Sequence, residues 1–199
     1  MPALALPFAH LNLRFNPFGE ATASDRELLA VVEVDRFADL LRRGGAVEFV
    51  GDHGRGKSSH LLALHRHFPG APFVKLERPM RVAPAPILFI DEVDRVTNRA
   101  ALFARCRSIA LGAHASVASE LRAAGHDVES VQVSADPVRL KAIIARRIEW
   151  ARRGAGPVPG VPDAAILALV DRFGDDVRAI EACLYDRFQE LAEVGDVHV

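Results

Sequence analysis

The residues with the clearest chemical purpose lie in the stretch FVGDHGRGKSSHLL at positions 49–62. An apolar run ends at Gly51, four residues pass, and Gly56, Lys57 and Ser58 follow before leucines begin at helical spacing. This pattern between a strand and a helix is typical of loops that bind nucleotide phosphates, because bare backbone amides and a helix N-terminus can surround an anion. Lys57 would reach the β- and γ-phosphates, and the Ser58 hydroxyl would hold Mg²⁺.

The loop and the first turn of its helix are together predicted to bind ATP. The residues concerned are Gly51, Asp52, His53, Gly54, Arg55, Gly56, Lys57, Ser58 and Ser59. A flexible point charge is needed here, and arginine does not easily replace lysine in that role. Glu48 is unexpected, since it lies in the strand that enters the loop, and such a central strand should be apolar.

A second chemical feature is the stretch ILFIDEVD at positions 87–94. Its four apolar residues suit a strand that is buried on both faces, and ligands bind at the carboxyl ends of such strands. Asp91 is predicted to hold Mg²⁺ together with Ser58, directly or through water. Glu92 is predicted to polarise a water for attack on the γ-phosphate. Solvated acids at a strand end are the simpler alternative, which the neighbouring phosphate loop disfavours.

The elements that must position these residues alternate between short apolar runs and helical patterns, which predicts an α/β fold with a parallel sheet. The expected strands are Ala46–Val50, Pro72–Glu77, Ile87–Asp91, Ser108–Ala113 and Glu129–Ser134. The expected helices of this part are Lys57–Phe68, Thr97–Arg107 and Ala115–Ala124. After Ser134 only helical patterns follow, in Arg139–Arg153, Asp163–Phe173 and Asp176–Leu191. We therefore expect an α/β core over residues 1–134 and a helical appendage over residues 135–199.

Composition narrows the class of protein. The 199 residues suit one domain with a small appendage, and half of them are hydrophobic. A formal net charge of −1 gives no general attraction to nucleic acid or membranes. Cys106 and Cys183 form no CxxC pair, which favours a reducing compartment and no structural zinc. Without a signal peptide or a membrane-spanning apolar run, the expectation is a cytoplasmic protein with no membrane association.

Taken together, these features resemble the AAA+ ATPases. The motifs that carry the resemblance are GDHGRGKS, ILFIDE and the helical appendage with FGDDVRAIE. The resemblance implies ATP hydrolysis with Mg²⁺ and an appendage that acts as a lid over the nucleotide. It also implies that Arg178 is the sensor 2 residue, which touches the γ-phosphate. The first turn of a helix disfavours a cation, and a bound phosphate would offset that cost.

The resemblance implies two further polar roles. His114 matches the sensor 1 position at the end of the strand after Asp91, although the family more often has Asn or Thr there. The family's arginine finger comes from the end of the next helix and acts on a neighbouring subunit. Arg122 fits that position best, and Arg105 and Arg107 are weaker candidates.

The segment NPFGE near the N-terminus resembles the adenine-side segment of origin-recognition-like, transposition-regulator and secretion-associated members. This assigns Asn16, Pro17 and Phe18 to the adenine side of the nucleotide. A plain turn with a packed Phe18 explains the same residues equally well.

Two features bear on the kind of ATPase. Only nine residues separate Glu77 from Ile87, fewer than a crossover between parallel strands needs, so the pore-loop region of protein unfoldases is nearly absent. The helix Arg139–Arg153 carries six basic residues against Glu149. That face could contact DNA phosphates, meet an acidic neighbour in a ring or filament, or simply be solvated. The histidines at positions 60, 65 and 67 are expected at the surface.

The preferred interpretation is an ATPase that acts as a nucleotide-dependent assembly switch. It would self-associate into a ring or filament, with DNA as a candidate partner, and any protein client would bind the compact core or its assembly. Two alternatives stay open. A small-molecule kinase is disfavoured by Glu92, which argues for activation of water. A nucleotide-binding scaffold with little hydrolysis is the other.

Overall fold

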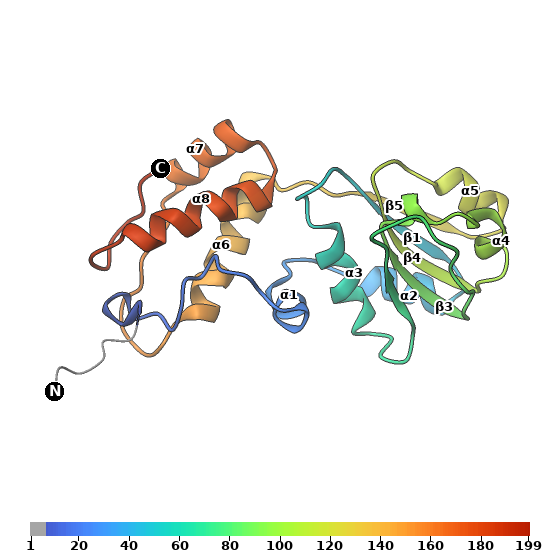
Figure 1. Ribbon diagram of the computed structural model, residues 1–199, viewed down its shortest axis with the longest axis horizontal. Coiled ribbons are helices and arrows are strands. Elements are labelled where there is room, and N and C mark those ends of the chain that lie inside the picture. Colours follow the sequence, from blue (N-terminus) through green and yellow to red (C-terminus); the bar gives the residue numbers. More distant parts are fainter. Residues whose placement is uncertain (1–6) are drawn as a thin grey trace. The chain divides into compact units, whose positions relative to one another are not determined.

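The computed structural model describes residues 7–199, apart from the side chains of Ala23 and Glu27 (Figure 1). The chain forms two compact units. One comprises Arg26–Ser134, and the other combines the residues up to Asp25 with Ala135–Val199. Helix α1 (Ala23–Leu29) spans the boundary between them.

The unit Arg26–Ser134 is built on a sheet of five parallel strands in the order β2-β3-β4-β1-β5. The strands are β1 (Ala46–Val50), β2 (Phe73–Lys75), β3 (Ile87–Asp91), β4 (Ser108–Ala113) and β5 (Val128–Gln132). All residues of the central strands β1 and β4 are buried, as a doubly covered parallel sheet requires. The predicted α/β class with a parallel sheet is confirmed.

Helices cover both faces of this sheet (Figure 1). They are α2 (Asp35–Arg42), α3 (Lys57–His65), α4 (Arg99–Phe103) and α5 (Ala118–Ala123). Side chains of α2 and α3 share one core cluster with Phe49 and Phe89. Side chains of α4 and α5 share the other with Leu88 and Ile90. Adjacent residues of β3 thus enter opposite cores, which follows from the alternation of side chains along a strand.

The predicted elements of this unit differ from the observed ones mainly in length. The bounds of β1, β3 and β4 agree, while α4 and α5 are shorter than predicted and α3 ends three residues earlier, at His65. Along residues 7–199 as a whole, four elements were not predicted: the helices α1 and α2 and the 3₁₀ turns η1 (Ala9–Leu11) and η2 (Val93–Arg95). The connection from β2 to β3 contains no helix, although the two strands pair in parallel.

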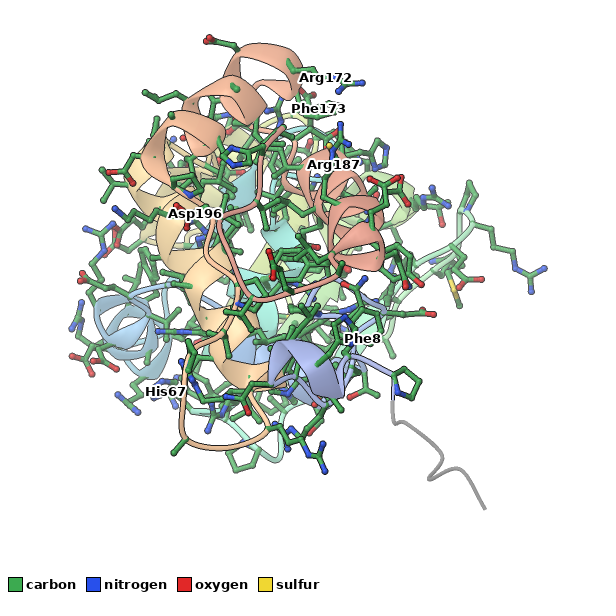
Figure 2. The ribbon with its side chains drawn as sticks, turned by 90° about the vertical axis from the view of Figure 1, so that its left-hand side faces the viewer. Phe8, His67, Arg172, Phe173, Arg187 and Asp196 are labelled. Carbon is green, nitrogen blue, oxygen red and sulfur yellow. The ribbon has the colours of Figure 1, made fainter. Side chains whose placement is uncertain are left out.

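The helical unit consists of α6 (Pro137–Ala151), α7 (Asp163–Phe173) and α8 (Val177–Glu190). The carboxylate of Asp136 caps α6 by accepting from the backbone N–H of Arg139 at 2.7 Å, and Pro137 occupies the first helical position. The core of the unit contains Leu140, Ile144 and Phe188, among others. Near the chain end, Asp196 (labelled in Figure 2) is bridged to Gly160 in the loop between α6 and α7.

The N-terminal segment differs from the expectation that placed it with the α/β core. Leu11, Leu13 and Phe18 are buried in the hydrophobic core of the helical unit. The backbone N–H of Arg14 also donates to the carbonyl of Ala151 at the end of α6. The apolar spacing of this segment thus serves the helices that follow 120 residues later, which no local pattern could reveal.

Among residues 7–199, no helix has the length and apolar character that a membrane crossing would need.

Candidate nucleotide site

The phosphate loop connects β1 to α3, as the motif predicts. Gly54 and Gly56 have φ values of 82° and 97°, in the left-handed region where residues with a Cβ are strained. Gly56 directly precedes the first residue of α3, so the turn delivers Lys57 and Ser58 into the first helical turn. Asp52 and His53 are exposed at the outer side of the loop. The glycines are therefore needed for the geometry of the turn itself.

Lys57 is buried, with 5% of its surface exposed. Its Nζ donates to the carbonyl oxygens of Gly51 at 2.7 Å and Asp52 at 2.9 Å, so the ammonium lies back across its own loop. Burial lowers the pKa of Lys57 below the ordinary lysine value, and the nearby carboxylates of Glu92 and Asp91 oppose that shift. A bound anion would supply the charge compensation that two neutral carbonyls give only in part.

Ser58 and Asp91 meet at the predicted metal position. The Ser58 hydroxyl donates to Asp91 Oδ2 at 2.8 Å. Asp91 is 1% exposed, and its Oδ1 has no hydrogen-bond donor among the residues the structure describes. A buried carboxylate oxygen without a donor is costly and calls for a cation. Gly112 of β4 leaves room there, since an added Cβ would lie 3.2 Å from that oxygen.

These oxygens fit Mg²⁺, which binds oxygen ligands through one or two protein groups and keeps its remaining positions for water or phosphate. When bound, the ion would neutralise phosphate charge. Ser58 and Asp91 would hold it from two elements that the sheet fixes, α3 and β3.

Glu92 follows β3 directly and has an unusual backbone. Its φ of 68° and ψ of 54° lie in the left-handed region, which is rare for a residue that is not glycine, asparagine or aspartate. The 3₁₀ turn η2 holds this conformation, because the N–H of Arg95 donates to the Glu92 carbonyl at 3.0 Å. Such strain clusters at functional sites. It turns the Glu92 carboxylate away from the direction that a continued strand would give.

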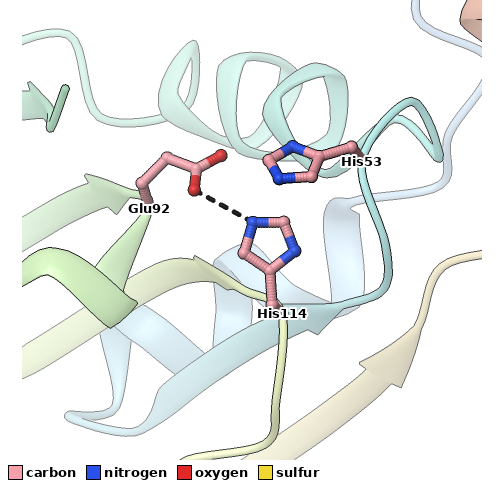
Figure 3. Close-up of side chains that lie close together, drawn as sticks. All are labelled: His53, Glu92 and His114. Atoms are coloured by element: carbon pink, nitrogen blue, oxygen red, sulfur yellow. Dashed lines mark hydrogen bonds and ion pairs between the residues drawn. The ribbon is translucent and has the colours of Figure 1, made fainter.

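His114 lies beside Glu92, at the end of β4 (Figure 3). His114 Nε2 is 3.0 Å from Glu92 Oε2, and the His114 backbone N–H donates to Asp94 Oδ2 at 2.9 Å. The ring of His53, from the phosphate loop, has its centroid 4.1 Å from that of His114. The histidine at the predicted sensor 1 position thus contacts the carboxylate that is predicted to activate water.

Glu48, the unexpected acid of β1, is completely buried, and both of its carboxylate oxygens accept hydrogen bonds. Its Oε1 accepts from the hydroxyls of Ser116 at 2.5 Å and Ser130 at 2.6 Å, and its Oε2 accepts from the backbone N–H of Val117 at 2.8 Å. Glu48 therefore joins β1 to the turn after β4 and to β5. Its role is to position that turn, which also carries His114.

The arginines of the α/β unit that were considered as fingers are all exposed, but they differ in their contacts. Arg122 is on α5, as predicted. Arg107 donates through Nη2 to the carbonyl of Arg42 at 3.0 Å, so it has a partner in its own unit. Arg105 lies just after α4.

Arg178 belongs to the helical unit, in the first turn of α8, where its side chain is exposed. Its backbone N–H and that of Ala179 donate to Asp176 Oδ1, each at 3.1 Å, so an aspartate caps this helix.

The NPF segment is engaged within the helical unit. Asn16 Nδ2 donates to the carbonyl of Tyr185 at 2.9 Å, and its Oδ1 accepts from the N–H of Phe18 at 3.0 Å. The Phe18 ring packs edge-on against Phe188 with centroids 5.1 Å apart. The Pro17 carbonyl accepts from Arg147 at 2.9 Å. These contacts are those of a well-anchored turn.

The basic helix α6 carries less free charge than its sequence indicates. Arg147 is buried and forms a two-pronged ion pair with Glu181, at 2.6 and 2.9 Å. Two more of its basic residues have acidic partners, Lys141 with Asp163 at 2.5 Å and Arg152 with Glu149 at 2.7 Å. Counting Arg152, which lies just past the end of α6, at least three of the six basic side chains of residues 139–153 are therefore paired with acids, so this segment is a weaker match to DNA than its count of charges predicts.

The prediction of surface histidines in α3 is wrong for His60. It is 6% exposed, its ring lies 4.9 Å from that of Phe49, and its Nδ1 is 2.9 Å from the Gly56 carbonyl. His65 is half-buried, and its Nε2 is 2.8 Å from the Ala71 carbonyl. His60 packs against Phe49 and His65 against Phe73 and Phe89, so both are polar members of the core, and of these three histidines only His67 is exposed.

The site as a whole is that of the P-loop nucleotide-binding fold, with a phosphate loop after β1 and an acidic pair at the end of β3. No protein-family model matches the sequence, and no curated protein matches it. Solved structures do match. An arginine-to-alanine variant of RuvB from Thermotoga maritima aligns with a TM-score of 0.56 at 17% identity, over 81% of this chain and 63% of that one.

Two further RuvB structures from the same organism align with TM-scores of 0.51. One is titled as a Holliday junction branch migration motor, with 17% identity over 85% of this chain and 61% of that one. The other is a threonine-to-valine variant, with 16% identity over 86% and 65%. This chain spans less than two thirds of the length of each. The predicted fold is confirmed: the chain has the fold of the AAA+ P-loop ATPases.

Proposed function

We propose that this protein binds ATP with Mg²⁺ and hydrolyses it. The observation that carries the proposal is the pairing of Ser58 with Asp91, whose second carboxylate oxygen is buried without a donor. These two residues lie at the carboxyl edge of a parallel sheet, and Ser58 directly follows Lys57, whose side chain is buried. The arrangement provides a cation site and a phosphate cradle side by side.

In this proposal Lys57 exchanges its two carbonyl contacts for phosphate oxygens. Glu92 orients and deprotonates the attacking water, and its strained backbone holds the carboxylate ready for that task. His114 positions Glu92 through the contact between Nε2 and Oε2. The helical unit supplies the lid, with Arg178 on the γ-phosphate and Asn16 to Phe18 on the adenine side.

We further propose that ATP controls self-association into a ring or filament, with Arg122 reaching the nucleotide of a neighbouring subunit. DNA is a proposed partner because one structural match is titled as a motor for Holliday junctions. Since at least three basic side chains of residues 139–153 are paired with acids, this segment alone does not account for DNA binding. Turnover that DNA stimulates and that added salt suppresses would support the partnership.

The direct test is Glu92→Gln, which keeps the shape of the side chain and removes its basicity. We expect ATP binding to persist and turnover to fall by about two to four orders of magnitude. The matched control is Glu129→Gln, the same change at a carboxylate that pairs with Arg36 at 3.1 Å. Phosphate release without any added acceptor separates hydrolysis from kinase chemistry. Turnover of Glu92→Gln at the wild-type rate would remove Glu92 from the mechanism.

A further inference from the structure

Three side chains with metal-binding atoms converge above the sheet from separate connections. His53 comes from the loop after β1, Glu92 follows β3, and His114 follows β4. One ligand atom of each lies within 4.8 Å of the other two (Figure 3). The sheet itself causes this proximity, because Val50 and Ala113 are register partners at the ends of β1 and β4.

One of the separations between these atoms is already close to that in a tetrahedral zinc site. Ligands at 2.0–2.1 Å from a tetrahedral ion lie about 3.3 Å apart. Glu92 Oε2 and His114 Nε2, at 3.0 Å, already have nearly this separation. His53 is exposed on its loop, so a small movement or a rotamer change brings its imidazole to the same distance.

The donor set also selects a class of ion. Two imidazole nitrogens and one carboxylate oxygen suit Zn²⁺ and its neighbours in the first transition row. Mg²⁺ prefers oxygen, which Ser58 and Asp91 offer separately. Asp94 accepts from the backbone N–H of His114 at 2.9 Å and so fixes the main chain of the residue that carries this imidazole.

We propose that His53, Glu92 and His114 form an inhibitory site for a divalent transition metal of the zinc class, with a solvent molecule in the fourth position. Binding replaces the hydrogen bond between His114 and Glu92: the neutral imidazole of His114 carries its proton on Nδ1, and Nε2 and Oε2 each direct a lone pair at the metal. Glu92 is then a metal ligand and no longer available to water. This consequence for turnover rests on the proposed function, whereas the metal site itself does not.

The site is tested first on nucleotide-free protein by Zn²⁺ titration, in competition with a chromophoric chelator. Wild-type protein should bind a single Zn²⁺ through these residues. His53→Ala and His114→Ala should each weaken the affinity for Zn²⁺ by about 100-fold or more, because removing even a residue that only hydrogen-bonds to a metal ligand lowers metal affinity about 10–100-fold. The matched control is His67→Ala, because His67 is exposed in the same unit and its Nε2 lies 3.8 Å from Oδ1 of Asp35, away from the proposed site. Circular dichroism checks that each variant is folded.

Equal Zn²⁺ affinity in wild type, His53→Ala and His114→Ala would overturn the proposal and place the metal elsewhere, with the thiols of Cys106 and Cys183 as alternatives. Visible absorption of bound Co²⁺ gives a second readout. A tetrahedral spectrum in wild type that is lost in His53→Ala supports the site, and a spectrum of thiolate ligation contradicts it.

Turnover is measured separately, at a fixed excess of Mg²⁺ and buffered free Zn²⁺. Zinc should inhibit wild type and His67→Ala, and a chelator should restore both. Whatever turnover His53→Ala retains should resist the same free zinc. If wild type never hydrolyses ATP, the proposed function fails while the titration still decides the metal site. If wild type turns over and zinc binds without inhibiting it, the inhibitory role is overturned.

Discussion

Replacing Glu48 tests how the sheet holds the turn that carries His114. In Glu48→Leu the side chain keeps its bulk but accepts no hydrogen bonds. The Val117 N–H then stays buried without an acceptor, since Val117 is 4% exposed. That loss costs about 1–3 kcal/mol. Ser116 and Ser130 are exposed enough for water to replace part of their bonds, so each adds about 0.5–1 kcal/mol. We expect a total loss of about 2–5 kcal/mol.

Glu48→Gln should be much milder. The amide oxygen can accept from the Val117 N–H, and the amide nitrogen can donate to the two serine hydroxyls, whose hydrogens rotate away. All three contacts then persist without the charge, at a cost of about 1 kcal/mol. The pair of variants thus separates hydrogen bonding from mere bulk at one buried position.

The assay is urea unfolding, followed by circular dichroism and by the fluorescence of Trp150. Because Trp150 is the protein's sole tryptophan and lies in α6, its signal reports on the helical unit. If the circular dichroism transition moves to lower urea while the Trp150 fluorescence transition does not, the loss of stability lies in the α/β unit. Glu48→Leu with wild-type stability, or a Gln variant as unstable as the Leu variant, would refute this account of Glu48.

Three further predictions concern the nucleotide. Lys57→Ala should abolish ATP binding in calorimetry without unfolding the protein. In wild type, the affinity for ATP should fall as the pH rises through the pKa of Lys57, because the neutral amine does not attract phosphate, and burial lowers that pKa. Arg178→Ala should weaken ATP more than ADP, and equal losses would indicate a role in folding of the helical unit instead. Arg122→Ala should bind ATP yet lose about 10³–10⁵ in turnover. Mixing it with Lys57→Ala should restore part of the activity, and no recovery despite co-assembly in light scattering would exclude Arg122.

Sequence patterns predicted the strands well where burial alone determines them. The run at Ile87–Asp91 is apolar up to its terminal acid, and the run at Ala46–Val50 is apolar apart from Glu48 and is followed by glycine, so their bounds were clear. Helices α4 and α5 were predicted too long, because the flanking residues could continue a helix but lie in tight turns that tertiary contacts fix. Helix α2 was missed, although Phe37, Leu40 and Leu41 have helical spacing.

The part of the candidate site that lies within sequence motifs could be predicted. Lys57, Ser58 and Asp91 follow from their spacing and from the edge at which parallel strands end. The contact of His53 with His114 depends instead on the register between β1 and β4, which a one-residue slip would change. Nothing in the spacing of positions 53, 92 and 114 signals a shared site. The sequence therefore shows which side chains could bind a metal or take part in catalysis, and only the pairing of strands shows which of them contact one another.

The turn after β4 links stability to chemistry in this fold. His114 contacts Glu92, and two residues later the same turn begins its bonds to Glu48 inside the sheet. A polar anchor in a central strand costs more than an apolar residue unless each of its bonds is made. Here all three are made, and two of them, from Ser116 and Val117, go to the segment that places His114, while the third comes from Ser130 of β5. The buried acid is thus best explained by the precision it gives to the position of Glu92's partner, since an apolar residue would serve the core alone equally well.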